Sequence, residues 1–171
     1  NSNITNAGVF NLSGGTFSAP AATMNQAKNL TVSGSPTFNA GTSTLNFSNT
    51  TAMTITPGNA SFNNVTFPGT AACVSYDLAA GTMNINGTLT LATSSWCGLP
   101  ARQINNGVLK AYGAVTYANQ GAVGTAIVRV AGNASGQTIT TSSGATIAGL
   151  DIDAGANNVT LSSAGTFNLI A

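Results

Sequence analysis

The chain has 171 residues, of which only 4% are charged, and its formal net charge is +1. The absence of histidine and glutamate excludes a histidine-based triad, a histidine metal site and a paired-glutamate hydrolase site. So few cations provide no basic surface for nucleic acid or for an anionic membrane. No run approaches the roughly 20 apolar residues of a membrane span. We therefore expect a protein that is not an enzyme, holds no metal or cofactor and does not enter a membrane.

Short segments in which apolar and polar residues alternate predict β-strands along the whole chain. Prolines and glycines separate these segments, and the 3.6-residue apolar period of an amphipathic helix occurs nowhere over a useful length. In chain order, the segments with the clearest alternation are 9–12, 45–47, 65–67, 83–86, 89–91, 128–130, 150–152 and 167–169. The sequence therefore predicts an all-β protein.

A repeated unit joins these strands into a larger pattern. Residues 41–67 and 124–152 both contain Gly-Thr and an alternating strand, then Thr-Ile-Thr, then a second alternating strand. The strand centres recur at intervals of roughly 15 to 23 residues, mostly near 20, a period typical of solenoids. These centres are Phe10, Leu30, Leu45, Val65, Ile85, Val108, Val128, Leu150 and Leu169.

The intervals predict a single-stranded parallel β-helix (β-solenoid) with coils of about 20 residues and roughly eight coils. We expect one such domain over residues 1–171. Equivalent strands of adjacent coils lie ~4.8 Å apart, so each side chain stacks on its counterpart one coil away. Like charges stacked in this way repel one another, whereas Asn, Ser and Thr form ladders of hydrogen bonds. This geometry explains why the surface has so few charges.

The two cysteines fit the coil length. Cys73 and Cys97 are 24 residues apart, and equivalent positions on adjacent coils lie within the Cα separation that a disulfide spans. We expect a disulfide between neighbouring coils, worth about 3 kcal/mol in the chain-entropy model and formed in an oxidising compartment. Two unrelated buried thiols are the alternative. Segment 93–103 breaks the periodicity, so we expect a projecting loop that this bond holds in place.

Both ends of the chain have strand-like sequence without an amphipathic helix or a charged cap. A bare solenoid end has an unpaired strand edge and uncovered core residues. We expect each end to stack on another copy, head to tail, or on flanking solenoid of the same polypeptide. The expected contact residues are Ile4, Val9, Phe10, Leu12, Phe167, Leu169 and Ile170.

Several segments resemble the β-strand repeats of very large secreted bacterial surface proteins. They are residues 37–47, residues 61–67, and residues 137–140 followed by residues 147–152. The resemblance implies an extracellular β-solenoid stalk, adhesin or fibre, and it includes no shared catalytic motif. We therefore expect an extracellular or cell-surface structural protein, a subunit or segment of a fibre, filament or surface appendage that assembles end to end. The alternative is a stalk or glycan-binding segment of a large bacterial adhesin.

Four aromatic residues leave glycan binding open. Tyr76, Tyr112, Tyr117 and Trp96 have rings that stack on sugars in other proteins, although packing at coil corners is the simpler interpretation.

Two further motifs in the sequence are weaker indications of a functional site. Asp151 and Asp153 are the only closely spaced carboxylates, and we interpret them as solvated strand positions. The Thr-x-Thr motifs at 54–56 and 88–90 suggest ice binding, but their irregular spacing in the sequence argues against a regular array of threonines.

Overall fold

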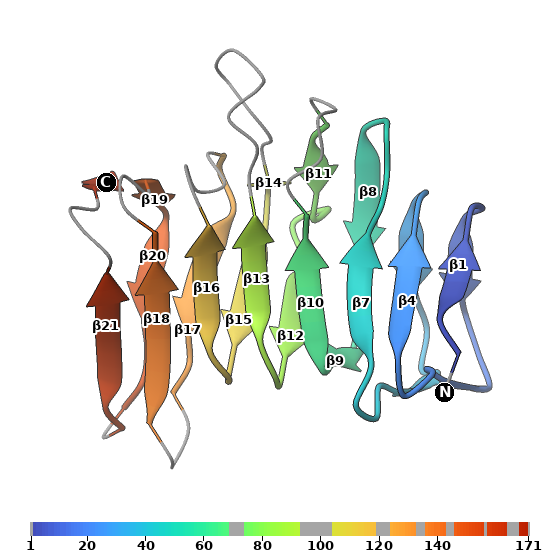
Figure 1. Ribbon diagram of the computed structural model, residues 1–171. Helices are drawn as coiled ribbons and strands as arrows, with labels where there is room; N and C mark the ends of the chain where they lie inside the picture. Colours follow the sequence, from blue (N-terminus) through green and yellow to red (C-terminus); the bar gives the residue numbers. More distant parts are fainter. Residues whose placement is uncertain are drawn as a thin grey trace.

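The computed structural model describes residues 2–68, 74–92, 104–118, 124–132, 136–142, 146–155, 157–163 and 168–170. The chain winds into a stack of coils, which Figure 1 shows in order from the N-terminus to the C-terminus. Each strand pair is parallel, and the described residues include no helix. The predicted all-β parallel β-solenoid is confirmed.

The longest sheet takes one strand from each successive coil. Its eight strands in spatial order are β1 (Ile4–Asn6), β4 (Thr23–Gln26), β7 (Thr44–Phe47), β10 (Asn64–Phe67), β13 (Leu89–Ala92), β16 (Val115–Ala118), β18 (Gln137–Thr141) and β21 (Val159–Ser163). The register offset is 20 residues where Ile4 pairs with Met24 and 26 where Leu89 pairs with Val115. The first coils therefore have the predicted period near 20 residues, whereas the central coils are a few residues longer than predicted.

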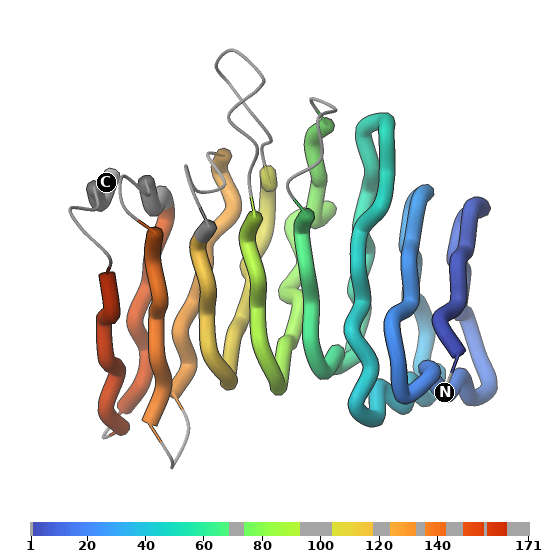
Figure 2. Tube along the Cα trace, viewed as in Figure 1, coloured from blue at the N-terminus to red at the C-terminus, as the bar shows by residue number. Residues whose placement is uncertain are grey.

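Two further faces complete the coils, and Figure 2 shows the resulting path of the chain. The second face contains β2 (Phe10–Leu12), β5 (Leu30–Val32), β8 (Met53–Thr56), β11 (Tyr76–Asp77) and β14 (Ile104–Asn105). The third contains β9 (Ser61–Phe62), β12 (Thr82–Ile85), β15 (Val108–Ala111), β17 (Ile127–Val130) and β20 (Leu150–Ile152). Two separate pairs join β3 (Thr16–Ser18) to β6 (Thr37–Asn39) and β19 (Thr146–Ala148) to β22 (Asn168–Ile170). The rings of Phe38 on β6 and Phe62 on β9 lie 4.9 Å apart, so β6 packs against the start of the third face.

The two copies of the sequence repeat lie on different faces. The first strand of the copy at 41–67 is β7 on the long sheet, whereas the corresponding strand of the copy at 124–152 is β17 on the third face. The Thr-Ile-Thr strands are β8 on the second face and β18 on the long sheet. Each face requires the same alternation of inward apolar and outward polar residues, so one pattern serves any of them.

Ladders of inward side chains form the core. On the long sheet Leu45, Val65, Leu89 and Val115 are each opposite the next in register, and all are buried. A second ladder lies two residues further along the same strands. In it the rings of Phe47 and Phe67 stack with their centroids 4.8 Å apart. Side chains alternate between the two sides of a strand. An apolar-polar-apolar segment therefore places its two apolar side chains in the core and its polar side chain outside.

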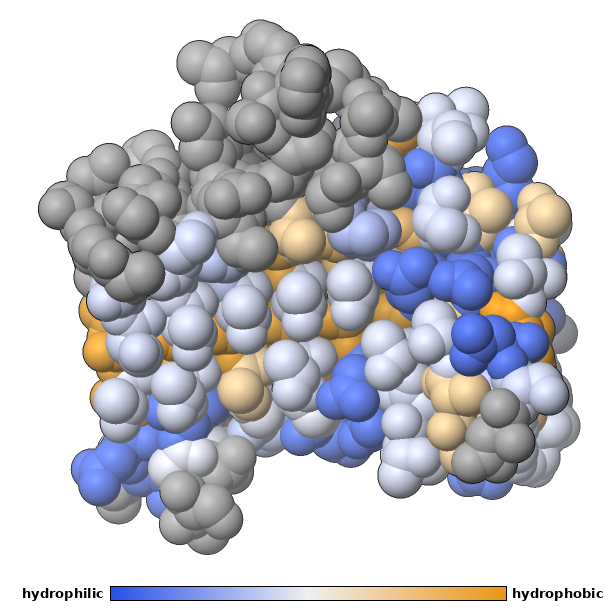
Figure 3. All heavy atoms as spheres, viewed as in Figure 1, coloured by the Kyte–Doolittle hydropathy of each residue, from blue (hydrophilic) through white to orange (hydrophobic). Residues whose placement is uncertain are grey.

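The outward side of the long sheet is neutral and polar. Figure 3 shows rows of pale residues that cross this side from coil to coil. In the first coils, asparagines bond to one another along a row, as where Asn46 Nδ2 donates to Asn25 Oδ1 at 2.8 Å. This finding agrees with the expected ladders of polar side chains.

The expected disulfide and the expected projecting loop fall outside the described residues. Cys73, Cys97 and segment 93–103 all belong to parts of the chain that the structure does not describe. Both remain predictions.

Tight stacking of the coil corners can be tested at two glycines with the same backbone angle. Gly58 and Gly41 both have φ of +55°, but a Cβ at Gly58 would lie 2.3 Å from the Val32 carbonyl oxygen, whereas Gly41 has open space. We expect Gly41→Ala to cost about 1 kcal/mol for its left-handed backbone and Gly58→Ala to cost at least about 2 kcal/mol more. Urea denaturation of both variants measures the difference, and equal losses would show that the corners are not in close contact.

Candidate functional site: the two ends of the coil stack

The N-terminal end of the stack leaves three strands with one neighbour each. In the described part of the chain, β1 pairs only with β4, β2 only with β5, and β3 only with β6. The side chains follow the same pattern: Ile4 on β1 is 43% exposed, whereas its register partner Met24 is 2% exposed. One further coil would be needed to bury this ladder.

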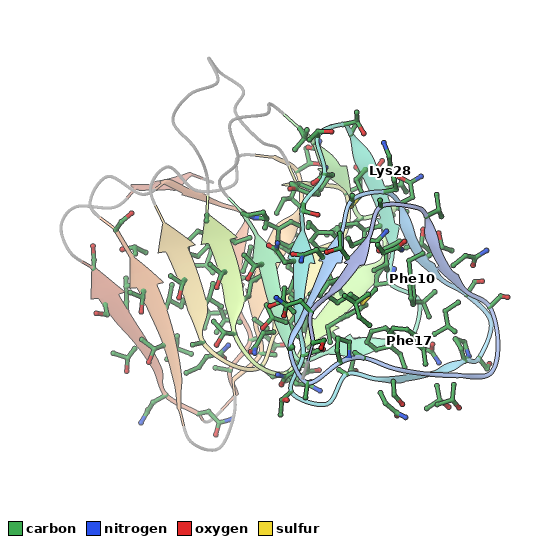
Figure 4. All side chains as sticks on the ribbon, turned by 45° about the vertical axis from the view of Figure 1, so that its right-hand side comes forward. Phe10, Phe17 and Lys28 are labelled. Atoms are coloured by element: carbon green, nitrogen blue, oxygen red, sulfur yellow. The ribbon has the colours of Figure 1, made fainter. Side chains whose placement is uncertain are left out.

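Partly covered aromatic rings lie inside the same end. Phe10 on β2 and Phe17 on β3 have ring centroids 5.0 Å apart in an edge-to-face arrangement, and both are half-buried. Figure 4 shows the two rings close together within the first coil, with Lys28 at a corner away from them. Val9, just before β2, is 63% exposed. This end therefore presents aliphatic and aromatic side chains together, with no charge among them.

The C-terminal end has the complementary edges. In the described residues β21 pairs only with β18, and β20 only with β17. Leu161 on β21 is 46% exposed, whereas its register partner Ile139 is buried. Ile152 on β20 is 55% exposed and lies opposite the buried Val130. The core ladders of the long sheet and of the third face therefore reach this end uncovered.

The expected end-contact residues have different outcomes. Ile4, Val9, Phe10 and Leu12 lie in the first coil, where the core is open, with Leu12 half-buried on the edge strand β2. Leu169 and Ile170 lie on the edge strand β22, whose side chains are not described. Phe167 falls outside the described residues.

Three exposed or half-buried end residues were not predicted. They are Phe17, Ile152 and Leu161. The motif Thr-Phe-Ser at 16–18 resembles Thr-Phe-Asn at 37–39, and this similarity between two coils was the available signal for Phe17. For Ile152 and Leu161 the alternation was visible, but their place on edge strands depends on the pairing of coils.

The charged residues of the third face lie in one row and interact with one another and with a neighbouring ring. Lys110, Arg129 and Asp151 occupy successive outward positions in register. Arg129 Nε donates to Asp151 Oδ2 at 2.7 Å, with both side chains more than a third exposed. Lys110 Nζ lies 5.1 Å from the centre of the Tyr112 ring. Two stacked cations are thus an exception to the expected avoidance of like charges, and a neighbouring carboxylate and an aromatic ring accompany them.

The remaining chemistry of the described residues is sparse. Asp77 Oδ1 accepts hydrogen bonds from the Ala79 amide at 2.8 Å and from Asn106 Nδ2 at 3.1 Å, so this carboxylate fixes a turn. No three His, Cys, Asp or Glu residues of the described segments lie close enough together to hold a metal ion. No helix in the same segments has the length and apolar character to span a membrane.

The tyrosines considered for sugar stacking are mostly inside the core. Tyr76 and Tyr117 are fully buried, and Tyr112 is half-buried beside Lys110. Trp96 lies outside the described residues. Two of the four rings are therefore unavailable to a glycan, which supports the interpretation that they pack in the solenoid.

Tyr117 gives a test of the core at alkaline pH. Its buried hydroxyl has no hydrogen-bond partner among the residues that the structure describes, and burial raises the pKa of this phenol. A raised pKa in the folded state contributes stability below the unfolded value of about 10, and this stability is lost as the pH rises beyond it. Tyr117→Phe removes both the unpaired hydroxyl and the titration. We expect it to stabilise the protein by about 1 kcal/mol at neutral pH and by more above pH 10, measured by urea denaturation at both pH values. A variant that is less stable at both would show that the hydroxyl has a partner.

Comparison with known proteins identifies no relative. No protein-family model, no curated protein and no solved structure matches the chain. The function must therefore be inferred from the geometry of the coil stack.

Proposed function

We propose that this protein is an extracellular structural protein, a β-solenoid subunit or segment of a fibre, filament or cell-surface appendage that grows end to end. The observation that supports the proposal is the exposure of the core ladders at both ends of the coil stack. Ile4 and Leu161 are at least 43% exposed at opposite edges of one sheet, although their register partners are buried. An added coil at either edge would continue the sheet.

The energetics favour covering these edges. A new parallel strand satisfies the unpaired backbone groups of the edge strand and buries its inward side chains. Full burial of one aliphatic side chain contributes about 1.5–3 kcal/mol, and Ile4, Ile152 and Leu161, whose register partners are buried, are all available for it. The covering coil belongs either to a second copy, stacked head to tail in an open arrangement, or to flanking solenoid of the same polypeptide.

The composition of the surface supports the extracellular structural role. The protein has only seven charged residues, four cationic and three acidic, and charged edge residues are a common protection against unwanted strand pairing. The resemblance of its strand repeats to those of large secreted bacterial surface proteins, noted in the sequence, also supports the proposal, although the comparisons match no such protein. A stalk within a large adhesin is the second candidate, and it uses the same ends through flanking coils.

Sedimentation velocity over a wide range of protein concentration tests the proposal. End-to-end growth predicts a series of species whose frictional ratio rises with mass, because each added copy lengthens the particle along one axis. A compact dimer with no larger species would contradict open-ended stacking. A monomer at all concentrations would contradict self-assembly and leave flanking coils of the same polypeptide as the only covering element.

A further inference from the structure

The outward side of the long sheet contains a row of hydroxyl side chains in register. One position on each of five successive strands carries threonine or serine, and each lies directly opposite the next. These residues are Thr66, Thr90, Thr116, Thr140 and Ser162. We call this row, together with the row beside it, the hydroxyl face.

The second row begins two residues earlier on each strand. Thr138 and Thr160 are opposite each other on β18 and β21. Leu89 pairs with Val115, so Thr88 lies opposite Ala114. Thr88 is two residues before Thr90 and therefore belongs to this second row. Only Asn64 and Ala114 interrupt the hydroxyls of this row.

The regularity comes from the pairing of coils rather than from the sequence spacing. Val65 pairs with Leu89 and Leu89 pairs with Val115, so successive coils differ in length by two residues. Because the strands stay in register, the additional residues lie at the corners. Of the two Thr-x-Thr motifs that suggested ice binding, only 88–90 lies on the hydroxyl face, where the register aligns it with threonines of the neighbouring coils. The motif at 54–56 lies on the second face.

The chemistry of the hydroxyl face narrows the class of ligand. None of its positions is charged, so the face is complementary to an uncharged ligand rather than to an ion or nucleic acid. None is aromatic, so it lacks the flat rings on which sugars stack. Figure 3 shows its pale rows crossing an open side of the molecule. An uncharged, periodic ligand that accepts and donates hydrogen bonds at regular intervals fits this surface.

We propose that the hydroxyl face binds the surface of ice crystals. Hydroxyls repeat at ~4.8 Å along each row, and the rows are roughly 6.6 Å apart, twice the rise per residue of a strand. Water molecules on a prism plane of hexagonal ice repeat at a similar distance along the rows and at a somewhat longer distance across them. The strands hold the hydroxyls rigidly, so little conformational entropy is lost when ordered water bonds to them. This inference does not depend on assembly at the ends of the stack.

Thermal hysteresis of the wild-type chain and of two lysine variants tests the proposal. Thr116→Lys places a long, charged side chain in the middle of the hydroxyl face, whereas Thr54→Lys places the same side chain at an exposed position on the second face. We expect measurable hysteresis for the wild type, retention in Thr54→Lys and loss of most of it in Thr116→Lys, because the lysine would hold the ice lattice away from the plane of the hydroxyls. Far-UV circular dichroism of each variant establishes that it is folded.

Two further variants keep the test decisive if Thr116→Lys fails to fold. Thr140→Val removes one hydroxyl with almost no change in shape, and Ala114→Thr supplies a missing one in the second row. The proposal predicts lower activity for the first and higher activity for the second. It is overturned if the wild type shows no hysteresis and no inhibition of ice recrystallisation, or if Thr54→Lys loses as much activity as a variant of the hydroxyl face.

Discussion

Replacement of Leu161 by lysine is expected to abolish end-to-end association of the chain. Leu161 is 46% exposed on β21, the edge strand at the C-terminal end of the long sheet. Association by strand addition would bury this side chain, and a lysine there would leave an unpaired charge in an apolar ladder. Loss of the leucine burial alone, about 1.5–3 kcal/mol, raises the concentration required for association by roughly tenfold or more.

Ile127→Lys is the matched control for that variant. Ile127 is an exposed apolar residue of similar size, 37% exposed, but it lies on β17 in the interior of the coil stack. We expect Ile127→Lys to associate like the wild type in sedimentation velocity, and Leu161→Lys to remain monomeric at the same concentrations. Equal weakening by both substitutions would mean that association proceeds through the sides of the stack.

Replacement of Phe47 by alanine is expected to destabilise the folded protein by about 3–5 kcal/mol. Phe47 is fully buried, and its ring centroid lies 4.8 Å from that of Phe67 and 5.8 Å from that of Tyr76. The truncation removes contacts with two rings of the next coil and leaves a cavity that rigid strands cannot close. The free energy of unfolding from urea denaturation measures the loss.

Phe17→Ala gives the comparison at the end of the stack. Phe17 is half-buried on the edge strand β3 and contacts Phe10 at 5.0 Å between ring centroids. We expect it to cost no more than about 2 kcal/mol, because part of its ring is already exposed to water. If Phe47→Ala costs no more than Phe17→Ala, the aromatic ladder is not the main stabilising element of the central coils.

The fold class was predictable because it depends on a local property. Alternation in segments such as 45–47 and 65–67 fixes which side chains point inward, and a period near 20 residues fixes that the coils stack. The assignment of strands to faces was not predictable. β7 and β17 belong to equivalent copies of the repeat yet lie on different faces, because each face requires the same apolar-x-apolar pattern.

The functional surfaces were predictable only where they follow from position in the chain. Ile4 and Val9 were expected at an open end because they lie in the first coil. The exposure of Ile152 and Leu161, and the alignment of Thr90 with Thr116, depend on long-range register. The corners set that register, and their lengths vary without a recognisable sequence signal.

Electron microscopy of the native material, combined with fibre diffraction of aligned samples, tests end-to-end growth most directly. Strands that run across the long axis of a continuous rod predict unbranched fibres and a strong meridional reflection at ~4.8 Å. Isolated particles no longer than one stack of eight strands, with no rods and no meridional reflection, would contradict the proposed structural role.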